Sequence, residues 1–356
     1  MKLNKNLYYK ILSPEFPHFI DKYITLSLLQ RLSGVGLLCG TDWTPLYHNN
    51  FFYSRLDHSI GVALIIWNFT HDRIQTIAGL LHDVSTPAFS HVTDFRKGDA
   101  LTQESTETEN GQMLRADAAL AACLESDGIT YDQVDDYHKY PIADNEVPGL
   151  SADRLEYMFP SGIIFDGSWN MAAVEETYRD IVVCRNENGF PELGFATEEI
   201  AVDYCRRCCS VGLVFQRNEN KVALQLMAEI LNSAVLCGVI KEKDCFVLSE
   251  KQLITRFESV AEDIGTRNSA DYKHFLRCFR TFRTMTHIEH TRSPLTGYFC
   301  VSIAVKKRYI NPLVVTQKKQ PLPEAVRIDK VSTKAADFIH DFITFTDSCY
   351  GCVKYI

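Results

Sequence analysis

The sequence predicts a mainly α-helical fold with a smaller α+β region, and three patterns support this prediction. Over most of the 356 residues, apolar side chains recur every three or four positions, as they do along one face of a helix. Segment 181–195 alternates around an Asn-Gly pair, which is typical of a β-hairpin. Segment 298–315 is β-branched and alternating, as strands are. We therefore expect a helical core over residues 1–178 and an α+β C-terminal region over 179–356 that packs on it.

The first part of the chain is expected to form helices separated by one loop. An amphipathic helix is predicted from His18 to Gly34 or Gly36, because glycine commonly follows the last helical turn. Turn formers and aromatic residues dominate 39–54, which we expect to be a loop. Helical spacing returns over 55–81, where we expect two successive helices that form a hairpin.

The remaining elements are mostly predicted helices. One is expected over 113–128, closed by a glycine. Ser151 can cap another helix, because a serine hydroxyl accepts a hydrogen bond from the first helical turn. Residues 197–236 predict two helices with a break near Arg217, and 332–345 predict a last helix. In the segments FVLSEKQLITRF and DYKHFLRCFRTF, the apolar residues also have helical spacing.

Composition excludes several classes of protein. The formal charge of −8 argues against a nucleic-acid binder, because counterion release from phosphates requires a basic surface. The N-terminus lacks the apolar core of a signal peptide, and no stretch has the roughly eighteen apolar residues of a membrane span. The twelve cysteines are scattered rather than arranged as a disulfide framework. We expect a cytoplasmic protein with reduced thiols and no membrane partner.

The stretch 55–94 holds four of the eleven histidines, in positions that suggest a metal site. His58 begins the first helix of the predicted hairpin, and the pair His82-Asp83 ends the second, so the hairpin could bring them together. Imidazole nitrogens and carboxylate oxygens both bind divalent cations. Asp153 is the best candidate for a fourth ligand, because apolar neighbours would hold its helix against the core.

The order of these residues resembles the signature of the HD-domain metal-dependent phosphohydrolases, which is a histidine, a His-Asp pair and a distant aspartate. The segments RLDHSIGVALI, AGLLHDVSTPAFSHVTDF and ADRLEYMF resemble the sequences of the subgroup that contains the deoxynucleoside triphosphate triphosphohydrolases. The similarity covers roughly residues 25–315. It implies that residues 1–178 are an HD-type helical core. It also implies one or two divalent cations (manganese, iron, magnesium, cobalt or nickel) held by His58, His82, Asp83 and Asp153.

The resemblance also implies roles for residues around the metal. His91 matches a catalytic histidine that faces the phosphates, and Asp94 matches the carboxylate that orients it. Three residues match substrate-binding positions: Arg55 for phosphate, Tyr157 for the sugar, and Glu104 in the loop after the metal motif.

Three positions depart from the pattern of the triphosphohydrolases. Thr86 stands four residues after the histidine of the His-Asp pair, where these relatives carry a second histidine. Gln103 stands in place of a further histidine, with Thr108-Glu109 as an alternative register, and Leu37 replaces a glutamine that reaches the deoxyribose. A threonine hydroxyl does not act as a base near neutral pH. The predicted metal ligands are therefore complete, while the bond that is cleaved stays open.

The sequence therefore predicts a metal-dependent phosphohydrolase that acts on a nucleotide or another phosphorylated small molecule, and that could form a homo-oligomer. Two other classes stay open. One is a regulatory protein that binds metal and nucleotide without turnover, which the replacements at Thr86 and Gln103 would suit. The other is an interaction scaffold that uses the helical core as a platform.

Overall fold

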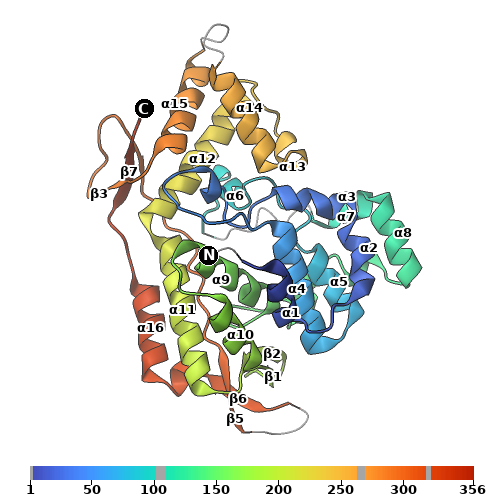
Figure 1. Cartoon of the computed structure of the whole chain (residues 1–356). Helices are drawn as coiled ribbons and strands as arrows, with labels where there is room; N and C mark the ends of the chain where they lie inside the picture. Colours follow the sequence, from blue (N-terminus) through green and yellow to red (C-terminus); the bar gives the residue numbers. More distant parts are fainter. Residues whose placement is uncertain (1–2, 102–109, 263–268, 318–321) are drawn as a thin grey trace.

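The computed structural model describes residues 3–101, 110–262, 269–317 and 322–356. Its helices form two groups, with a small four-stranded sheet at one end of the molecule (Figure 1). Helices α11 (Glu198–Gln216) and α12 (Asn218–Leu236) follow one another along one side and connect the two groups (Figure 1). The predicted break between them is confirmed, because Arg217 has an extended backbone (φ −70°, ψ 152°). The fold is mainly α with a smaller β component, as predicted.

The N-terminal region contains α1 (Lys5–Leu12) and a chain of short helical turns. The prediction of a single helix from His18 is wrong, because Leu26 has an extended backbone (ψ 137°) that interrupts it. The region instead holds four short segments: η1 (His18–Ile20), α2 (Asp21–Ile24), α3 (Ser27–Gln30) and η2 (Arg31–Gly34). The loop over 39–54 is confirmed, apart from the turn η3 (Thr41–Trp43).

The predicted helical hairpin is confirmed and lies at the centre of the first helix group. Its helices are α4 (Arg55–Thr70) and α5 (Arg73–Leu81). Ser54 and Asp57 form a reciprocal capping box that fixes the first residue of α4. Asp72 caps α5 by accepting two backbone N–H bonds. Most of α4 is buried on all sides, so it is the axis around which the neighbouring helices pack.

The segment after the hairpin contains α6 (Val92–Arg96) and two helices where one was predicted. These are α7 (Asn110–Ala116) and α8 (Ala118–Asp127), separated because Asp117 is extended and caps α8. Gly128 ends α8 with a positive φ of 67°, as expected for a glycine in this position. Two 3₁₀ turns follow, η4 (Tyr131–Gln133) and η5 (Tyr137–Lys139).

Helix α9 (Ala152–Phe165) packs against both α4 and α11, and α10 (Met171–Arg179) follows it. The cap predicted at Ser151 is confirmed, since its hydroxyl accepts from the Arg154 N–H. This cap fixes where α9 begins and places Asp153 in its first turn.

Two small sheets make up the β component of the described residues. The predicted hairpin is confirmed as β1 (Ile181–Arg185) and β2 (Pro191–Phe195), which close with β5 (Leu313–Gln317) and β6 (Glu324–Arg327). The second sheet has the order β3-β7-β4, from Glu289–Thr291, Tyr350–Lys354 and Tyr298–Val301. The single strand predicted over 298–315 is wrong, because β4 and β5 belong to different sheets. Between them, residues 302–312 cross the molecule without regular structure.

The last helices complete two hydrophobic cores. These helices are α13 (Asp244–Val247), α14 (Glu250–Glu262), α15 (Ala270–Thr284) and α16 (Thr333–Thr344), and the turn η6 (Ile328–Lys330) precedes α16. One core surrounds α4, α5, α9 and α11, and the other surrounds α12, α14 and α15. Among the described residues, no helix combines the length and the apolar character that crossing a membrane requires.

Candidate metal centre and its cavity

Three elements of the first helix group bring the predicted metal ligands together. His58 lies in the first turn of α4, His82 and Asp83 follow the end of α5, and Asp153 lies in the first turn of α9. We call these four residues the metal-ligand cluster. The hairpin α4–α5 and the packing of α9 on α4 produce it, so residues far apart in sequence become neighbours.

The donor atoms of the cluster converge on one point. Nε2 of His58 lies 3.0 Å from Asp153 Oδ1 and 3.9 Å from Asp83 Oδ2. Nε2 of His82 lies 3.8 Å from the same Asp153 oxygen and 3.6 Å from Asp83 Oδ2. One ligand atom from each of His58, His82 and Asp83 can be chosen so that all three lie within 4.8 Å of one another. Two imidazoles and two carboxylates at this spacing suit a divalent cation.

An orphaned atom supports the same interpretation. His82 Nε2 is buried and has no hydrogen-bond partner among the described residues. Leaving a buried polar atom without a partner costs roughly 1–3 kcal/mol. A bound cation would remove this cost, so the residues present fit a metal ion.

The other nitrogen of each histidine is held so that Nε2 faces the centre. His82 Nδ1 lies 2.7 Å from the Gly79 carbonyl oxygen, and only a protonated Nδ1 can bond to a carbonyl. His58 Nδ1 lies 2.6 Å from Glu156 Oε2. Outer partners of this kind fix the tautomer and orientation of metal-binding histidines.

Glu156 is a functional residue that the sequence interpretation missed. Its carboxylate is fully buried and accepts from the hydroxyls of Tyr8 (2.9 Å) and Tyr53 (2.6 Å) in addition to its contact with His58. Gly61 makes room for it, since a Cβ there would lie 2.5 Å from Glu156 Oε1. The available signal was spacing, because Glu156 lies three residues after Asp153, close to it on the helix surface.

Asp83 is tied down by two side chains. Arg55 Nη1 donates to both of its carboxylate oxygens, at 3.0 and 2.9 Å. The Thr86 hydroxyl donates to Oδ1 at 2.8 Å. Burial alone would raise the pKa of Asp83, but the charge of Arg55 and those of the two histidines hold it well below its usual range. Thr86 therefore orients a predicted metal ligand, and its hydroxyl is not a base.

His58 shares a proton with its carboxylate partners in this structure. Burial alone would lower the pKa of His58, but hydrogen bonds to Asp153 and Glu156 raise it to about 10. Because a metal binds neutral imidazole, a cation entering the cluster must displace this proton.

The predicted catalytic pair lies beside the cluster. His91 Nδ1 is 2.9 Å from Asp94 Oδ2, and Asp94 is completely buried. Burial lowers the pKa of His91, and the charges of Arg308 and Arg55 act in the same direction. The contact with Asp94 opposes this lowering of the pKa, and it fixes the orientation of the His91 ring.

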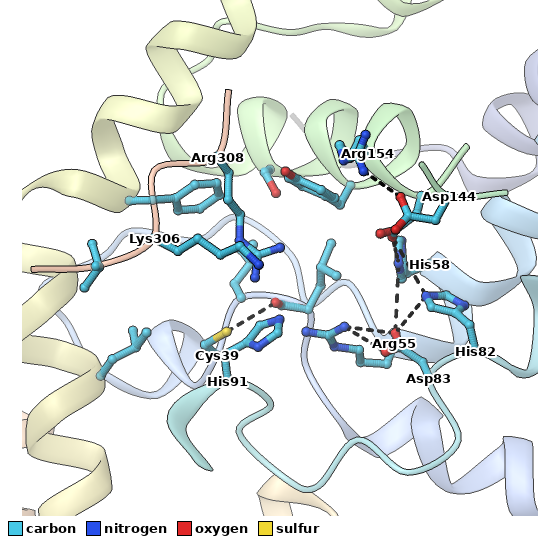
Figure 2. A pocket seen from close by; sticks show the side chains of 18 of the residues that line it. Cys39, Arg55, His58, His82, Asp83, His91, Asp144, Arg154, Lys306 and Arg308 are labelled. Carbon is cyan, nitrogen blue, oxygen red and sulfur yellow. Dashed lines mark hydrogen bonds and ion pairs between the residues drawn. The ribbon is translucent and has the colours of Figure 1, made fainter. Parts of the chain in front are cut away.

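A cavity of about 670 Å³ contains the cluster, together with Arg55, His91 and Tyr157. Lys306 and Arg308, on the irregular segment 302–312, line the opposite wall. Figure 2 shows both of these cations pointing towards His91, with His58, His82 and Asp83 on the other side of the cavity. The rest of the lining is mixed. It includes the apolar side chains of Phe165, Phe215, Leu224 and Val305 and polar ones such as His138, Asp144 and Arg154.

The other sequence predictions concern Leu37 and the residues around Glu104. Leu37, which stands where a family glutamine was expected, lines the cavity. Glu104, Gln103 and the alternative register Thr108-Glu109 lie outside the residues that the structure describes.

Comparisons with known proteins give two curated relatives and a solved structure of similar fold. No family model matches the chain. Among curated proteins, the uncharacterized protein YdhJ of Bacillus subtilis is 27% identical over 236 residues, covering 66% of this chain and 69% of that protein. The metal-dependent phosphohydrolase cns2 of Cordyceps militaris is 21% identical over 241 residues, covering 65% of this chain and 66% of that protein. The alignments therefore span about two thirds of each of these relatives.

A solved structure shares the whole fold. A phosphohydrolase from Bacteroides thetaiotaomicron superimposes with a TM-score of 0.63 and 13% identity, over 98% of this chain and 95% of that one. At this identity the likeness shows a shared fold, and one curated relative is itself a metal-dependent phosphohydrolase, while the chain carries a buried His-His-Asp cluster that could hold a metal ion.

Proposed function

We propose that this protein is a metal-dependent phosphohydrolase that acts on a nucleotide or a related phosphate ester or anhydride. One observation carries the proposal: the metal-ligand cluster, Arg55 and His91 line the same cavity. A cation bound there would lower the pKa of a bound water and neutralise charge on the phosphoryl group.

The residues around the cluster supply the other needs of phosphoryl transfer. Arg55 places a fixed positive charge beside the cluster, where it would draw phosphate oxygens as well as hold Asp83. His91 uses Nδ1 to contact Asp94, which leaves Nε2 for a proton exchanged with the leaving oxygen or with water.

The cavity favours a substrate with more than one charged group and an organic part. Lys306 and Arg308 add positive charge on the wall opposite the cluster, where further phosphate oxygens could bind. A volume of about 670 Å³ exceeds the need of a phosphate group alone. The rings of Tyr157, Phe165 and Phe215 also line the cavity and would accommodate a sugar and a base. These features support a nucleotide.

The decisive experiment combines metal analysis with a substrate panel. The purified protein is tested for metal content and then for release of phosphate, pyrophosphate or triphosphate. Substrates are ribo- and deoxynucleoside mono-, di- and triphosphates and simple phosphoesters, each with manganese, magnesium, iron, cobalt or nickel. We expect metal-dependent hydrolysis that is lost in the double variant His82→Ala/Asp83→Ala.

A matched control uses the exposed ion pair His18–Asp21, in which the same residue types lie far more exposed than in the cluster. The double variant His18→Ala/Asp21→Ala should keep metal and activity. Unchanged metal content and activity in His82→Ala/Asp83→Ala would contradict the proposal.

A second candidate function is regulation by nucleotide binding without turnover. It is favoured by Thr86, because this hydroxyl donates to a metal ligand at a position where related hydrolases carry a histidine. Thermal stabilisation by a nucleotide, with no product under any of the five metals, would favour this alternative.

A further inference from the structure

A buried carboxylate from the second helix group reaches towards the candidate active site. Glu250, the first residue of α14, is fully buried. Its Oε1 accepts from the backbone N–H groups of Gly36 (2.8 Å) and Phe89 (3.0 Å), and its Oε2 accepts from Trp43 Nε1 (2.7 Å). None of the ion pairs among the described residues includes Glu250. Burying a carboxylate that has only neutral hydrogen-bond donors costs free energy, so a role in the fold or in the site should account for the position of Glu250.

The two backbone donors belong to two turns with an unusual conformation. We call them the Gly36 turn (residues 36–40) and the Phe89 turn (residues 87–91). Cys39 in the first, and Phe89 and Ser90 in the second, have positive φ values of 54°, 66° and 53°. Such conformations in non-glycine residues persist only where surrounding contacts hold them.

The turns also contact each other. A Cβ at Gly40 would lie 2.9 Å from the Phe89 ring, so only glycine leaves this ring in place. The Ser90 hydroxyl donates to the Gly36 carbonyl at 2.8 Å. Glu250 therefore bonds to both members of a packed pair of turns.

Both turns lead directly into the candidate active site. The Ser90 hydroxyl accepts from Arg55 Nε at 3.0 Å, and Arg55 in turn holds Asp83. His91 follows Ser90, and Cys39 and His91 both line the cavity. The direction of the Arg55 guanidinium and of the His91 ring thus depends on two turns that share Glu250 Oε1 as an acceptor.

We propose that Glu250 is a positioning residue of this site, which holds the Gly36 and Phe89 turns together and so sets the directions of Arg55 and His91. It contacts neither the metal-ligand cluster nor the cavity among the described residues, and it acts through backbone N–H groups. Its effect on phosphate binding rests on the proposed function, whereas its effect on the two turns does not.

The first test is hydrogen–deuterium exchange of the full-length protein. Glu250→Met keeps most of the side-chain volume but removes the acceptor. We expect at least tenfold faster exchange in peptides covering Gly36–Gly40 and Phe89–His91, with α4 still protected. Exchange in both turns at the wild-type rate would overturn the proposal, whatever the activity of the enzyme.

The second test measures binding of Mn²⁺, and then of inorganic phosphate in the presence of Mn²⁺, by calorimetry. We expect Glu250→Met to weaken phosphate binding at least fivefold and to change Mn²⁺ binding less than twofold. A lower melting temperature with wild-type phosphate binding would show a merely structural role and overturn the proposal. A wild-type protein that binds no Mn²⁺ would overturn the proposed function and the phosphate effect, while the exchange measurement would still decide whether Glu250 holds the turns.

A rescue variant separates the acceptor from its charge. In Glu250→Gln, the new amide must face either Trp43 Nε1–H or the two backbone N–H groups. Adding Trp43→Phe removes the indole donor, so the amide oxygen can accept from Gly36 and Phe89 together. We expect Glu250→Gln/Trp43→Phe to restore protection and phosphate binding towards wild type, with Trp43→Phe alone close to wild type. Fast exchange of both turns in the double variant, with Trp43→Phe alone at the wild-type rate, would overturn the proposal even if Glu250→Met does not fold.

Discussion

Single residues behind the metal ligands determine whether those ligands can bind a cation. His58 presents Nε2 to the cluster only because Glu156 takes its Nδ1. The same carboxylate is fixed by two tyrosine hydroxyls, so its position depends on α1 and on the loop before α4. Thr86 likewise orients Asp83, because its hydroxyl donates a hydrogen bond to that carboxylate. Thr86 thus contacts the cluster, although it departs from the triphosphohydrolase pattern.

Glu156→Gln should weaken the metal site without unfolding the protein. The amide oxygen can still accept from Tyr8 and Tyr53, but the amide nitrogen would then face His58 Nδ1. His58 would have to accept at Nδ1 and carry its proton on Nε2, which is the tautomer that cannot bind metal. We expect Mn²⁺ affinity to fall about 10- to 100-fold by titration calorimetry.

The matched control for this prediction is Glu176→Gln, the same change at an exposed position on α10. It should leave Mn²⁺ affinity unchanged. Equal affinities for Glu156→Gln and the wild type would show that His58 does not depend on Glu156 for its tautomer.

At the scale of elements, the four-stranded sheet helps to place the helix that carries Asp153. Leu150, just before α9, donates its N–H to Glu192 Oε1 of β2 at 3.0 Å. Arg327 of β6 donates to both oxygens of Glu192, at 2.5 and 2.9 Å, and this pair is buried. The sheet and the start of α9 therefore share one buried carboxylate.

Arg327→Met should destabilise the protein strongly. It leaves the buried Glu192 carboxylate without its counter-charge, and breaking a buried pair from one side typically costs about 3–5 kcal/mol. The measurement is urea unfolding at pH 7. Arg179→Met, at an exposed i,i+4 pair on α10, is the control and should change stability by less than about 1 kcal/mol. A loss that small for Arg327→Met would mean that Glu192 finds other partners.

A histidine joins two further elements, and it makes stability depend on pH. His290 of β3 contacts Glu219 at the start of α12 (3.1 Å) and Asp347 before β7 (3.2 Å). Burial alone would lower the pKa of His290, but these two carboxylates raise it. Because the folded-state pKa lies above that of the unfolded chain, this contribution is complete below about pH 6.5. It is lost as pH rises through the higher folded-state value.

His290→Gln should therefore flatten the pH dependence of unfolding. Urea unfolding of both proteins at pH 5.5, 6.5, 7.5 and 8.5, roughly spanning the range of histidine titration, tests this. The difference in unfolding free energy should be largest at the lowest pH and shrink as pH rises. A difference that is constant with pH would show that the two carboxylates do not favour the charged imidazole.

For the whole molecule, the cavity depends on both helix groups. The first group supplies the metal-ligand cluster, while α12 and the segment 302–312 supply Leu224 and the two cations of the opposite wall. A ligand bound in the cavity would contact both groups and stabilise the fold that holds them in place.

Metal should accordingly raise the melting temperature. A cation at 100 times its dissociation constant stabilises a folded protein by about 2.7 kcal/mol. We expect Mn²⁺ to raise the melting temperature of the protein treated with EDTA, measured by scanning calorimetry. His82→Ala/Asp83→Ala should show no such shift, and an equal shift in this variant would place the stabilising metal elsewhere.

The sequence by itself determined most helices and the metal-ligand cluster. Helical spacing and capping residues act over a few positions, so α4, α5 and α9 could be predicted together with the predicted ligands in the first turns of α4 and α9 and just after α5. The prediction failed at Leu26, whose backbone is extended, and over 298–315, where the two strands pair with partners in different sheets.

Only the tertiary structure decided which distant residues support the site. Glu156, Glu250 and the pair Lys306 and Arg308 lie on separate elements, and nothing in their local sequence states which surface they will meet. A buried carboxylate becomes a positioning group only when packing brings donors from other segments within hydrogen-bond distance. Local geometry can be predicted from the sequence because the helix fixes the period at which apolar side chains recur. Contacts across the molecule follow instead from how the elements pack together.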